Sequence, residues 1–105
     1  MKILILGDLM GNSPRKALQE NLSKIIDDKK IDFTILNGEN AAEDGRGITK
    51  NITDELFSLG VDVITSGNHI WDKKETSEFI AKEERLLRPE NLAAGSPGNG
   101  YGIFL

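Results

Sequence analysis

Residues 61–72 read Val-Asp-Val-Ile-Thr-Ser-Gly-Asn-His-Ile-Trp-Asp, an apolar, strand-forming stretch that ends in Gly67 and a run of polar side chains. The chain contains the same pattern twice more, at Ile3–Leu6 with the glycine and aspartate that follow, and at Phe33–Leu36 with residues 37–40. Each stretch is followed by apolar side chains at helical spacing. Strands that alternate with helices predict right-handed βαβ units, and therefore an α/β fold with a mainly parallel sheet.

The ends of these elements carry recognisable signals. Ile3–Leu6 is an unbroken aliphatic run, which predicts a strand buried on both faces of the sheet. Ser13 is expected to cap the first helix and Thr49 the second. Asp72 is expected to cap the third, because a glutamate follows it at the spacing of a capping box, and this helix is expected to run towards Arg85.

Length and composition limit the classes of protein to which the chain can belong. Its 105 residues can build a single core. The net charge of -4 is spread along the chain, which argues against a nucleic-acid-wrapping surface. The lack of cysteine excludes a disulfide scaffold, a zinc ribbon and a thiol nucleophile. The apolar runs are too short for a signal peptide or a membrane span, so we expect a cytoplasmic protein. Residues 101–105 read as the start of a further strand.

Polar side chains follow all three predicted strands at the point where each strand ends. Asp8 follows the first strand, Glu39 and Asn40 follow the second, and Asn68 and His69 follow the third. Because the loops at the carboxyl ends of parallel strands converge, we expect these five side chains to lie together. Two uncompensated carboxylates in one place are costly unless cations lie between them. Oxygen-rich ligands suit manganese, magnesium or iron, so the pattern predicts a metal site.

Each of these positions has an ordinary structural explanation when it is taken alone. An aspartate after Gly7 is common in turns, asparagines often stabilise loops, and a lone histidine is more often structural than catalytic. Their joint occurrence at three equivalent strand ends favours chemistry. The sequence has no P-loop, no dinucleotide fingerprint in its first βα turn and no nucleophile elbow. Arg15 and Arg46 lie in or near loops where they could meet a phosphate, and Trp71 could stack on a base, although packing is its simpler role.

The segments around these residues resemble one known family. They are Ile5–Asp8, Asn37–Ala42, residues 47–49, Asp62–Lys73 and Leu87–Asn91. Together they resemble the N-terminal part of the YmdB-type metallophosphoesterases, which are relatives of the calcineurin-like phosphoesterases, and the resemblance covers essentially the whole chain. It implies that residues 1–105 form a single, incomplete domain, the N-terminal half of a four-layer α/β/β/α sandwich.

The resemblance also implies hydrolysis of phosphodiesters, with 2',3'-cyclic nucleotides as substrates, at a centre of two metal ions such as iron or manganese. By motif position, Asp8 would bind the first metal and Glu39 would bridge the two. Asn40 would complete a contact to the first metal, and Asn68 would bind the second. A hydroxide held between the metals would attack phosphorus, and His69 would donate a proton to the leaving oxygen.

Two departures from the wider pattern bear on this expectation. Calcineurin-like enzymes usually have a histidine two residues after the first aspartate, where this chain has Met10, and the YmdB-type branch lacks that histidine too. The family supplies three further histidine ligands from its C-terminal half, whereas His69 is the only histidine of this sequence. The four expected ligands fill about half of the roughly ten positions that two metals need. We therefore expect weak metal binding and little or no turnover by this chain alone.

Two other functions remain open at this point. A regulatory or partner-binding module would keep the same half-fold and pair, through an uncovered sheet face, with a second copy or with a C-terminal half. A flavodoxin-like or Rossmann-like half domain would bind a nucleotide without metal. For the enzyme, the expected partner is a small phosphoester or cyclic nucleotide, without stable nucleic-acid binding or membrane contact. The sequence identifies no substrate-binding residue.

Overall fold

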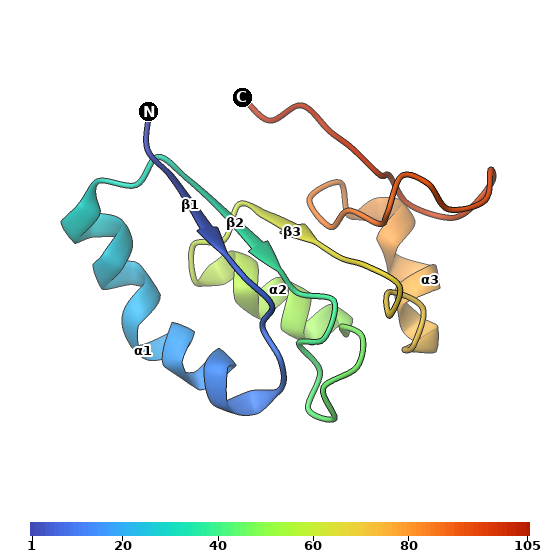
Figure 1. The fold of residues 1–105 in the computed structure, drawn as a ribbon, viewed down its shortest axis with the longest axis horizontal. Coiled ribbons are helices and arrows are strands. Elements are labelled where there is room, and N and C mark those ends of the chain that lie inside the picture. Colours follow the sequence, from blue (N-terminus) through green and yellow to red (C-terminus); the bar gives the residue numbers. More distant parts are fainter.

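The computed structural model describes all 105 residues, in which strands and helices alternate as the sequence predicts (Figure 1). The elements in chain order are β1 (Ile3–Leu6), α1 (Asn12–Lys29), β2 (Phe33–Asn37), α2 (Lys50–Ser58), β3 (Val63–Thr65), α3 (Lys74–Phe79) and a short 3-10 turn, η1 (Ile80–Lys82). No helix is long and apolar enough to cross a membrane.

The three strands form one parallel sheet in the order β1-β2-β3, which confirms the predicted α/β fold. The register pairs Ile5 with Ile35 and Ile35 with Val63, so equivalent residues of the three strands lie side by side. The sheet continues for a short distance beyond β3 through a parallel bridge between Ile64 and Leu86. This bridge was not predicted, because the third helix was expected to run towards Arg85, immediately before Leu86.

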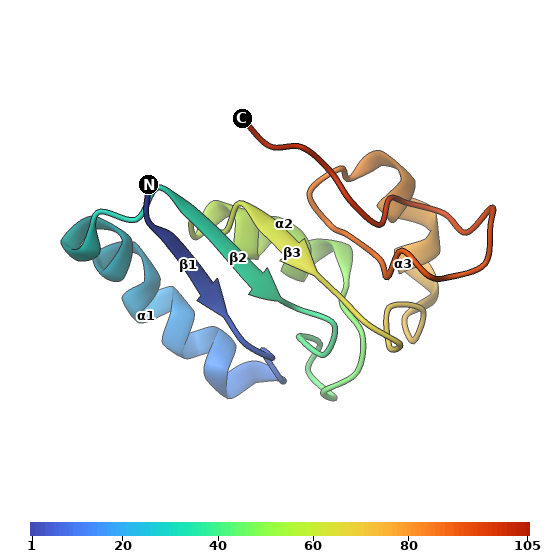
Figure 2. The ribbon, with the colours of Figure 1, turned by 45° about the horizontal axis from the view of Figure 1, so that its top comes forward.

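Helices α1 and α2 cover the same face of the sheet (Figure 2). Leu22 of α1 and Leu56 of α2 are fully buried in one core cluster with Leu36 of β2 and Ile64 of β3. The physical reason lies in the strand order. Two right-handed crossovers that step in the same direction, from β1 to β2 and from β2 to β3, bring both helices to one face.

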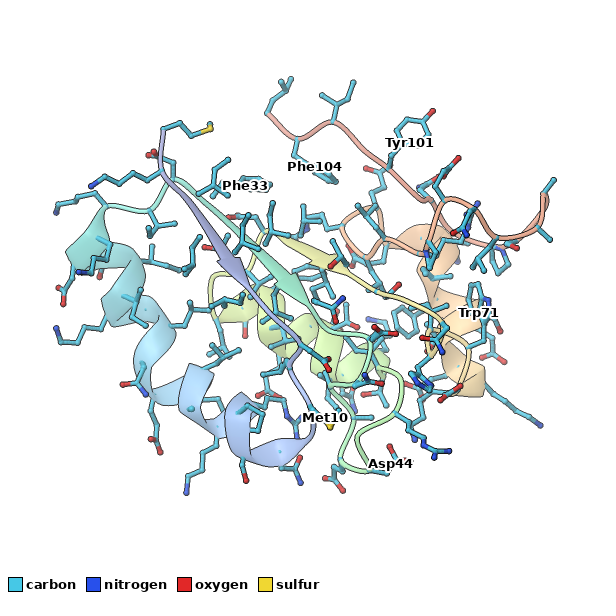
Figure 3. The ribbon with its side chains drawn as sticks, in the orientation of Figure 1. Met10, Phe33, Asp44, Trp71, Tyr101 and Phe104 are labelled. Carbon is cyan, nitrogen blue, oxygen red and sulfur yellow. The ribbon has the colours of Figure 1, made fainter.

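The opposite face of the sheet is largely uncovered. Ile3 and Ile5 of β1 are 51% and 72% exposed, which shows that the expectation of a strand buried on both faces is wrong for this chain. Beside them, Phe33 contacts Phe104 of the C-terminal segment, with ring centroids 6.2 Å apart (Figure 3). An aliphatic run shows that a strand face is apolar, but it does not show that the same chain covers it.

The helix starts agree with the sequence signals in one case of three. The Oγ1 atom of Thr49 accepts a hydrogen bond from the backbone N–H of Ile52, so Thr49 caps α2 as predicted. The prediction for Ser13 is wrong, because α1 already begins at Asn12, after Gly11 in a positive-φ conformation. The prediction for Asp72 is wrong as well, since α3 begins two residues later without a side-chain cap.

The last part of the chain also differs from the predictions. Helix α3 has only six residues and passes into η1, so it ends before Arg85. Residues 101–105 form no strand; they run back across the molecule towards its N-terminus (Figure 1). Most of their large side chains are exposed, because Tyr101, Ile103 and Leu105 have no sheet or helix to pack against.

Candidate functional site

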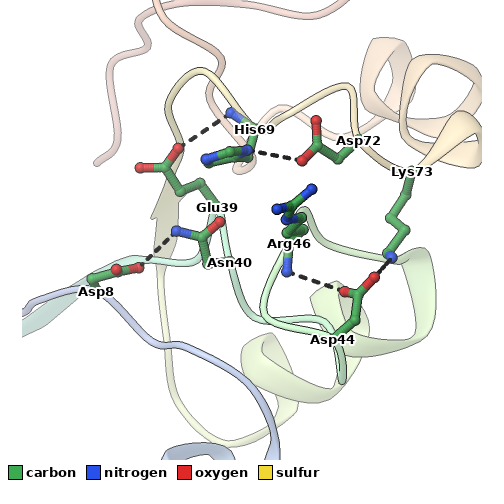
Figure 4. Close-up of polar contacts among 8 residues, drawn as sticks. All are labelled: Asp8, Glu39, Asn40, Asp44, Arg46, His69, Asp72 and Lys73. Atoms are coloured by element: carbon green, nitrogen blue, oxygen red, sulfur yellow. Dashed lines mark hydrogen bonds and ion pairs between the residues drawn. The ribbon is translucent and has the colours of Figure 1, made fainter.

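The polar residues predicted from the strand ends lie on the loops that follow β1, β2 and β3, at one end of the sheet (Figure 4). Asp8 lies in the loop after β1, and Glu39 and Asn40 form a turn directly after β2. His69 lies in the turn after β3, beside Asn68. The parallel arrangement therefore places these loops on the same edge, as the sequence predicts.

Asn40 links the loop after β2 to the loop after β1. Its Nδ2 atom donates to Oδ1 of Asp8 at 3.5 Å, a long and weak hydrogen bond. Its backbone carbonyl accepts from the N–H of Gly11 at 3.1 Å. Asn40 is 8% exposed, and its Oδ1 atom is buried without any hydrogen-bond partner. A buried, unpaired amide oxygen is costly unless a cation or a donor meets it.

Glu39 links the loop after β2 to the loop after β3. Its Oε2 atom accepts from the backbone N–H of His69 at 3.4 Å. Its carboxylate also lies directly against the backbone of Gly67, where a Cβ atom would come within 2.6 Å of Oε1 and 2.7 Å of Cδ. A Cβ atom at residue 67 would therefore displace the carboxylate of Glu39 from this place.

His69 is held by a second acid of its own turn. Its Nδ1 atom lies 2.8 Å from Oδ2 of Asp72, and the side chains are 38% and 34% exposed. Asp72 was expected to cap a helix, so its contact with His69 was not predicted. The three-residue spacing of the two side chains was the only available signal. Asn68, next to His69, is exposed.

Two further hydrogen bonds join the loop after β2 to the segment after β3, at some distance in the chain from the five predicted site residues. Nζ of Lys73 donates to Oδ2 of Asp44 at 2.7 Å, and the hydroxyl of Thr76 donates to the carbonyl of Ile48 at 2.8 Å. The hydrogen bond from Lys73, with a second one from the backbone N–H of Arg46, holds the pKa of Asp44 below its ordinary value.

The side chains at this sheet edge suit a metal that prefers oxygen ligands, but they do not make a complete ligand set. Two carboxylates and two amides approach the same sheet edge, and the unpaired Oδ1 of Asn40 is the kind of atom that a cation satisfies. However, no three acidic or histidine side chains lie close enough together to hold a metal ion. The residues present therefore fit part of a ligand set.

Of the other residues that the sequence singled out, Arg46 is exposed, whereas Arg15 and Trp71 make contacts elsewhere. Arg15 forms a hydrogen bond with Asn12 and an ion pair with Glu55. Trp71 is partly buried and packs against the core, which agrees with the simpler of its two interpretations. A cavity of about 500 Å³ lies beside the loop after β2, lined by Arg15 and Lys73 among others, but none of the five predicted site residues lines it.

Comparison with known proteins identifies the family. The family model described as YmdB-like protein matches residues 4–105. The chain belongs to the YmdB-like family. This match confirms the resemblance that was drawn from the strand-end motifs, because it spans almost the whole chain and includes every predicted site residue.

Relatives of known name or structure agree with this membership. The chain is 46% identical over 100 residues to a 2',3'-cyclic-nucleotide 2'-phosphodiesterase of Bacillus subtilis, a match that covers 95% of the chain and 38% of that protein. A solved structure of a novel phosphatase from Mycoplasma pneumoniae is 30% identical with a TM-score of 0.90 and covers all of this chain and 38% of the other. A Thermus thermophilus protein of solved structure is 38% identical, with a TM-score of 0.86, over 95% of this chain and 38% of the other.

The coverage has a structural consequence. The chain spans 38% of the length of each of these proteins. Its single layer of helices on a single parallel sheet therefore corresponds to part of a larger fold in the relatives, as expected for an N-terminal half. The names of the relatives support membership in a family of phosphoester hydrolases.

Proposed function

We propose that this chain provides one side of the active site of a metal-dependent phosphodiesterase that acts on 2',3'-cyclic nucleotides. The substrate class follows the name of the Bacillus subtilis relative. The observation that carries the proposal is the buried, unpaired Oδ1 of Asn40, whose Nδ2 donates to Asp8, at the sheet edge that also carries Glu39. Neutral amides and acids gathered in this way are suited to cations with a preference for oxygen ligands.

Each residue has a definite part in the proposed site. Asp8 and Asn40 would hold one metal, Asn68 a second, and Glu39 would bridge the two, with iron or manganese as the ions. Bound metal ions supply positive charge that polarises the phosphoryl group and activates the attacking water. The chain's own contribution is to hold the carboxylate of Glu39 through the N–H of His69 and that of Asp8 through the amide of Asn40.

His69 is the proposed proton donor. When the phosphodiester bond breaks, negative charge develops on the leaving alkoxide oxygen, and a proton must reach it. With Nδ1 occupied by Asp72, the Nε2 atom of the ring is the one available to give that proton. Loss of His69 would therefore lower turnover more than metal content.

The proposal includes weak metal binding by this chain in isolation, because four of its side chains offer about half of the ligands that two metals need. The test is metal content after incubation with Mn²⁺, together with hydrolysis of bis(p-nitrophenyl) phosphate. Both quantities are measured on this chain and on a longer protein in which this chain is joined to the part of a relative that it does not cover.

The variants separate the two roles. Asp8→Ala and Glu39→Ala should lower metal content, whereas His69→Ala should retain metal and lose turnover. Asp28→Ala, on the exposed side of α1, is the control and should change neither quantity. Equal metal occupancy in all variants, or hydrolysis that persists in excess EDTA, would contradict the proposal.

A second candidate is a partner-binding module, and the exposed Ile3 and Ile5 favour it. Exposed apolar area of this kind often marks a contact surface. In this alternative a second copy of the chain, or a C-terminal half, covers the open sheet face. Sedimentation velocity over a range of concentrations tests it. A single monomeric species at all concentrations, with no association with the remaining part of a relative, would count against this alternative.

A further inference from the structure

The strongest feature outside the predicted site is the way in which Asp72 holds His69. Two contacts join these residues. The backbone N–H of Asp72 donates to the carbonyl of His69 at 3.0 Å, which closes a turn. The Oδ2 atom of Asp72 then lies 2.8 Å from Nδ1 of the imidazole (Figure 4). The turn itself brings the carboxylate of Asp72 to the imidazole, so the contact does not depend on the position of more distant segments.

The chemistry of this contact decides which ring nitrogen carries a proton. An ionised carboxylate can only accept hydrogen bonds, so a hydrogen bond to Asp72 requires the proton on Nδ1. In the neutral imidazole, the other nitrogen, Nε2, is then an acceptor. Asp72 has no competing role, because it does not cap α3 and no other side chain of the chain bonds to its carboxylate.

The rest of His69 is held from the opposite side. Its backbone N–H donates to Oε2 of Glu39 at 3.4 Å. In Figure 4 the imidazole lies between Glu39 and Asp72, with Asp72 on the side away from Asp8 and Asn40. The nitrogen that Asp72 leaves free is therefore the one available to the strand-end cluster.

We propose that Asp72 is a positioning residue that keeps the proton of His69 on Nδ1, so that Nε2 is the nitrogen that exchanges protons at the site. This inference rests on the proposed role of His69 as proton donor and adds the residue that orients it. The ring that donates is the imidazolium, with a proton on each nitrogen. When Nε2 gives its proton to a leaving oxygen, the ring is left as the neutral Nδ1–H tautomer, which the hydrogen bond to Asp72 favours over the Nε2–H tautomer.

The test reads the tautomer directly and does not require activity. His69 is the only histidine of the chain, so the imidazole nitrogens give a single set of signals after labelling with ¹⁵N-histidine. The ¹⁵N chemical shifts are measured at a pH where the ring is neutral, with EDTA present. We expect the wild-type ring to be mainly in the Nδ1–H form, whereas Asp72→Ala should shift the population several-fold towards Nε2–H, which free imidazole side chains favour.

Two further variants keep the test decisive. Asp54→Ala removes an exposed acid from α2 and should leave the tautomer unchanged. Asp72→Asn retains the size of the side chain, so it should fold like the wild type by circular dichroism and still lose the preference for Nδ1–H. A wild-type ring in the Nε2–H form, or the same tautomer ratio in the wild type and Asp72→Ala, would overturn the inference.

Activity separates this inference from the proposed function. In a form that hydrolyses bis(p-nitrophenyl) phosphate, Asp72→Ala should lower kcat by about 10- to 100-fold with little change in KM, the range seen when a residue that orients a site group is lost, and Asp72→Glu should restore part of the rate. Normal kcat in Asp72→Ala would overturn the positioning role and leave the proposed function standing. If Asp72→Ala shifts the tautomer but the longer form shows no metal-dependent hydrolysis, the hydrogen bond from His69 to Asp72 stands and the proposed function is overturned.

Discussion

Gly67 shows how a residue without a side chain can shape the candidate site. The carboxylate of Glu39 occupies the space into which a Cβ at residue 67 would project. The same carboxylate meets the N–H of His69, so the position of Glu39 depends on the absence of that methyl group. The glycines before Asp8 and after β3 look alike in the sequence, but only one of them has this role.

We predict that Gly67→Ala displaces the Glu39 carboxylate and lowers affinity for Mn²⁺ by about 10- to 100-fold, the usual effect of losing a group that orients a metal ligand. The affinity is measured by titration with Mn²⁺ in the longer form. Gly7→Ala is the matched control, because a Cβ at Gly7 would meet nothing within 4 Å. Equal losses in both variants would show that the effect is not specific to the contact with Glu39.

At the scale of single elements, only one of the two candidate caps, Ser13 and Thr49, forms a capping hydrogen bond. Thr49 accepts from the N–H of Ile52 and satisfies one of the free donors at the start of α2. Ser13 lies inside the first turn of α1, is exposed, and caps nothing. A good capping residue type is therefore not sufficient evidence for a cap.

Thr49→Ala should lower the free energy of unfolding by about 1 kcal/mol, the usual value of an N-cap hydrogen bond. Ser13→Ala should change it by less than about 0.5 kcal/mol, as expected for an exposed side chain without a defined contact. Urea denaturation followed by circular dichroism measures both. A larger effect of Ser13→Ala than of Thr49→Ala would contradict the cap assignment.

The loop after β2 and the start of α3 form one unit, through the contact of Lys73 with Asp44. The pKa of Asp44 is lowered in the folded chain by the Lys73 ammonium. A lowered pKa means that the charged carboxylate favours the fold. Its contribution is present above the ordinary pKa of aspartate and is lost as the pH falls through the lowered value. Both side chains reach solvent, so the contribution is small.

Lys73→Met should therefore raise the pKa of Asp44 towards its ordinary value, and NMR titration of the Asp44 side-chain carboxyl measures the change. Lys74→Met removes the neighbouring, exposed cation and is the control. The ion pair should make the wild type more stable than Lys73→Met only while Asp44 is ionised. Below the lowered pKa of Asp44, this part of the difference in the free energy of unfolding should disappear. An unchanged pKa in Lys73→Met would show that the contact is not formed in solution.

At the scale of the whole molecule, the two faces of the sheet differ in what they bury. Leu36 faces α1 and α2 and is fully buried, whereas Ile5 is 72% exposed on the opposite face. Both are aliphatic residues within strands that pair with one another. Their energetic contributions should therefore differ strongly, although their sequence contexts are alike.

Leu36→Ala should lower the free energy of unfolding by about 2–5 kcal/mol, as for large-to-small changes in a packed core. Ile5→Ala should cost less than about 1 kcal/mol in the isolated chain, because most of the side chain stays in water in the folded state. Thermal and urea denaturation of the isolated chain, at several protein concentrations, measure both. A large effect of Ile5→Ala would show that the open face is covered in solution, and its dependence on concentration would show whether a second copy covers it.

The sequence predicted the strands, the parallel sheet and the strand-end loops that carry Asp8, Glu39, Asn40, Asn68 and His69. It could do so because aliphatic runs, helical spacing and polar strand ends are local patterns, and parallel strands necessarily end at one edge. It also led to the family, whose model matches residues 4–105. Local pattern failed at Ser13 and Asp72, where the residue type was right and the backbone around it was not.

Tertiary structure alone decided the remaining features. Asp72 meets His69 and not the start of α3, Glu39 fills the space left open by Gly67, and Ile3 and Ile5 face solvent. The first depends on how the turn after β3 closes, the second on how two separate loops meet, and the third on the direction of the crossovers. The amino-acid sequence determined which side chains reach the edge of the sheet, because strand ends follow from local patterns and the parallel direction follows from the alternation of strands with helices. Packing decided most of what they touch, because Asn40 with Asp8 and Glu39 with Gly67 are pairs from separate loops whose proximity no local pattern records.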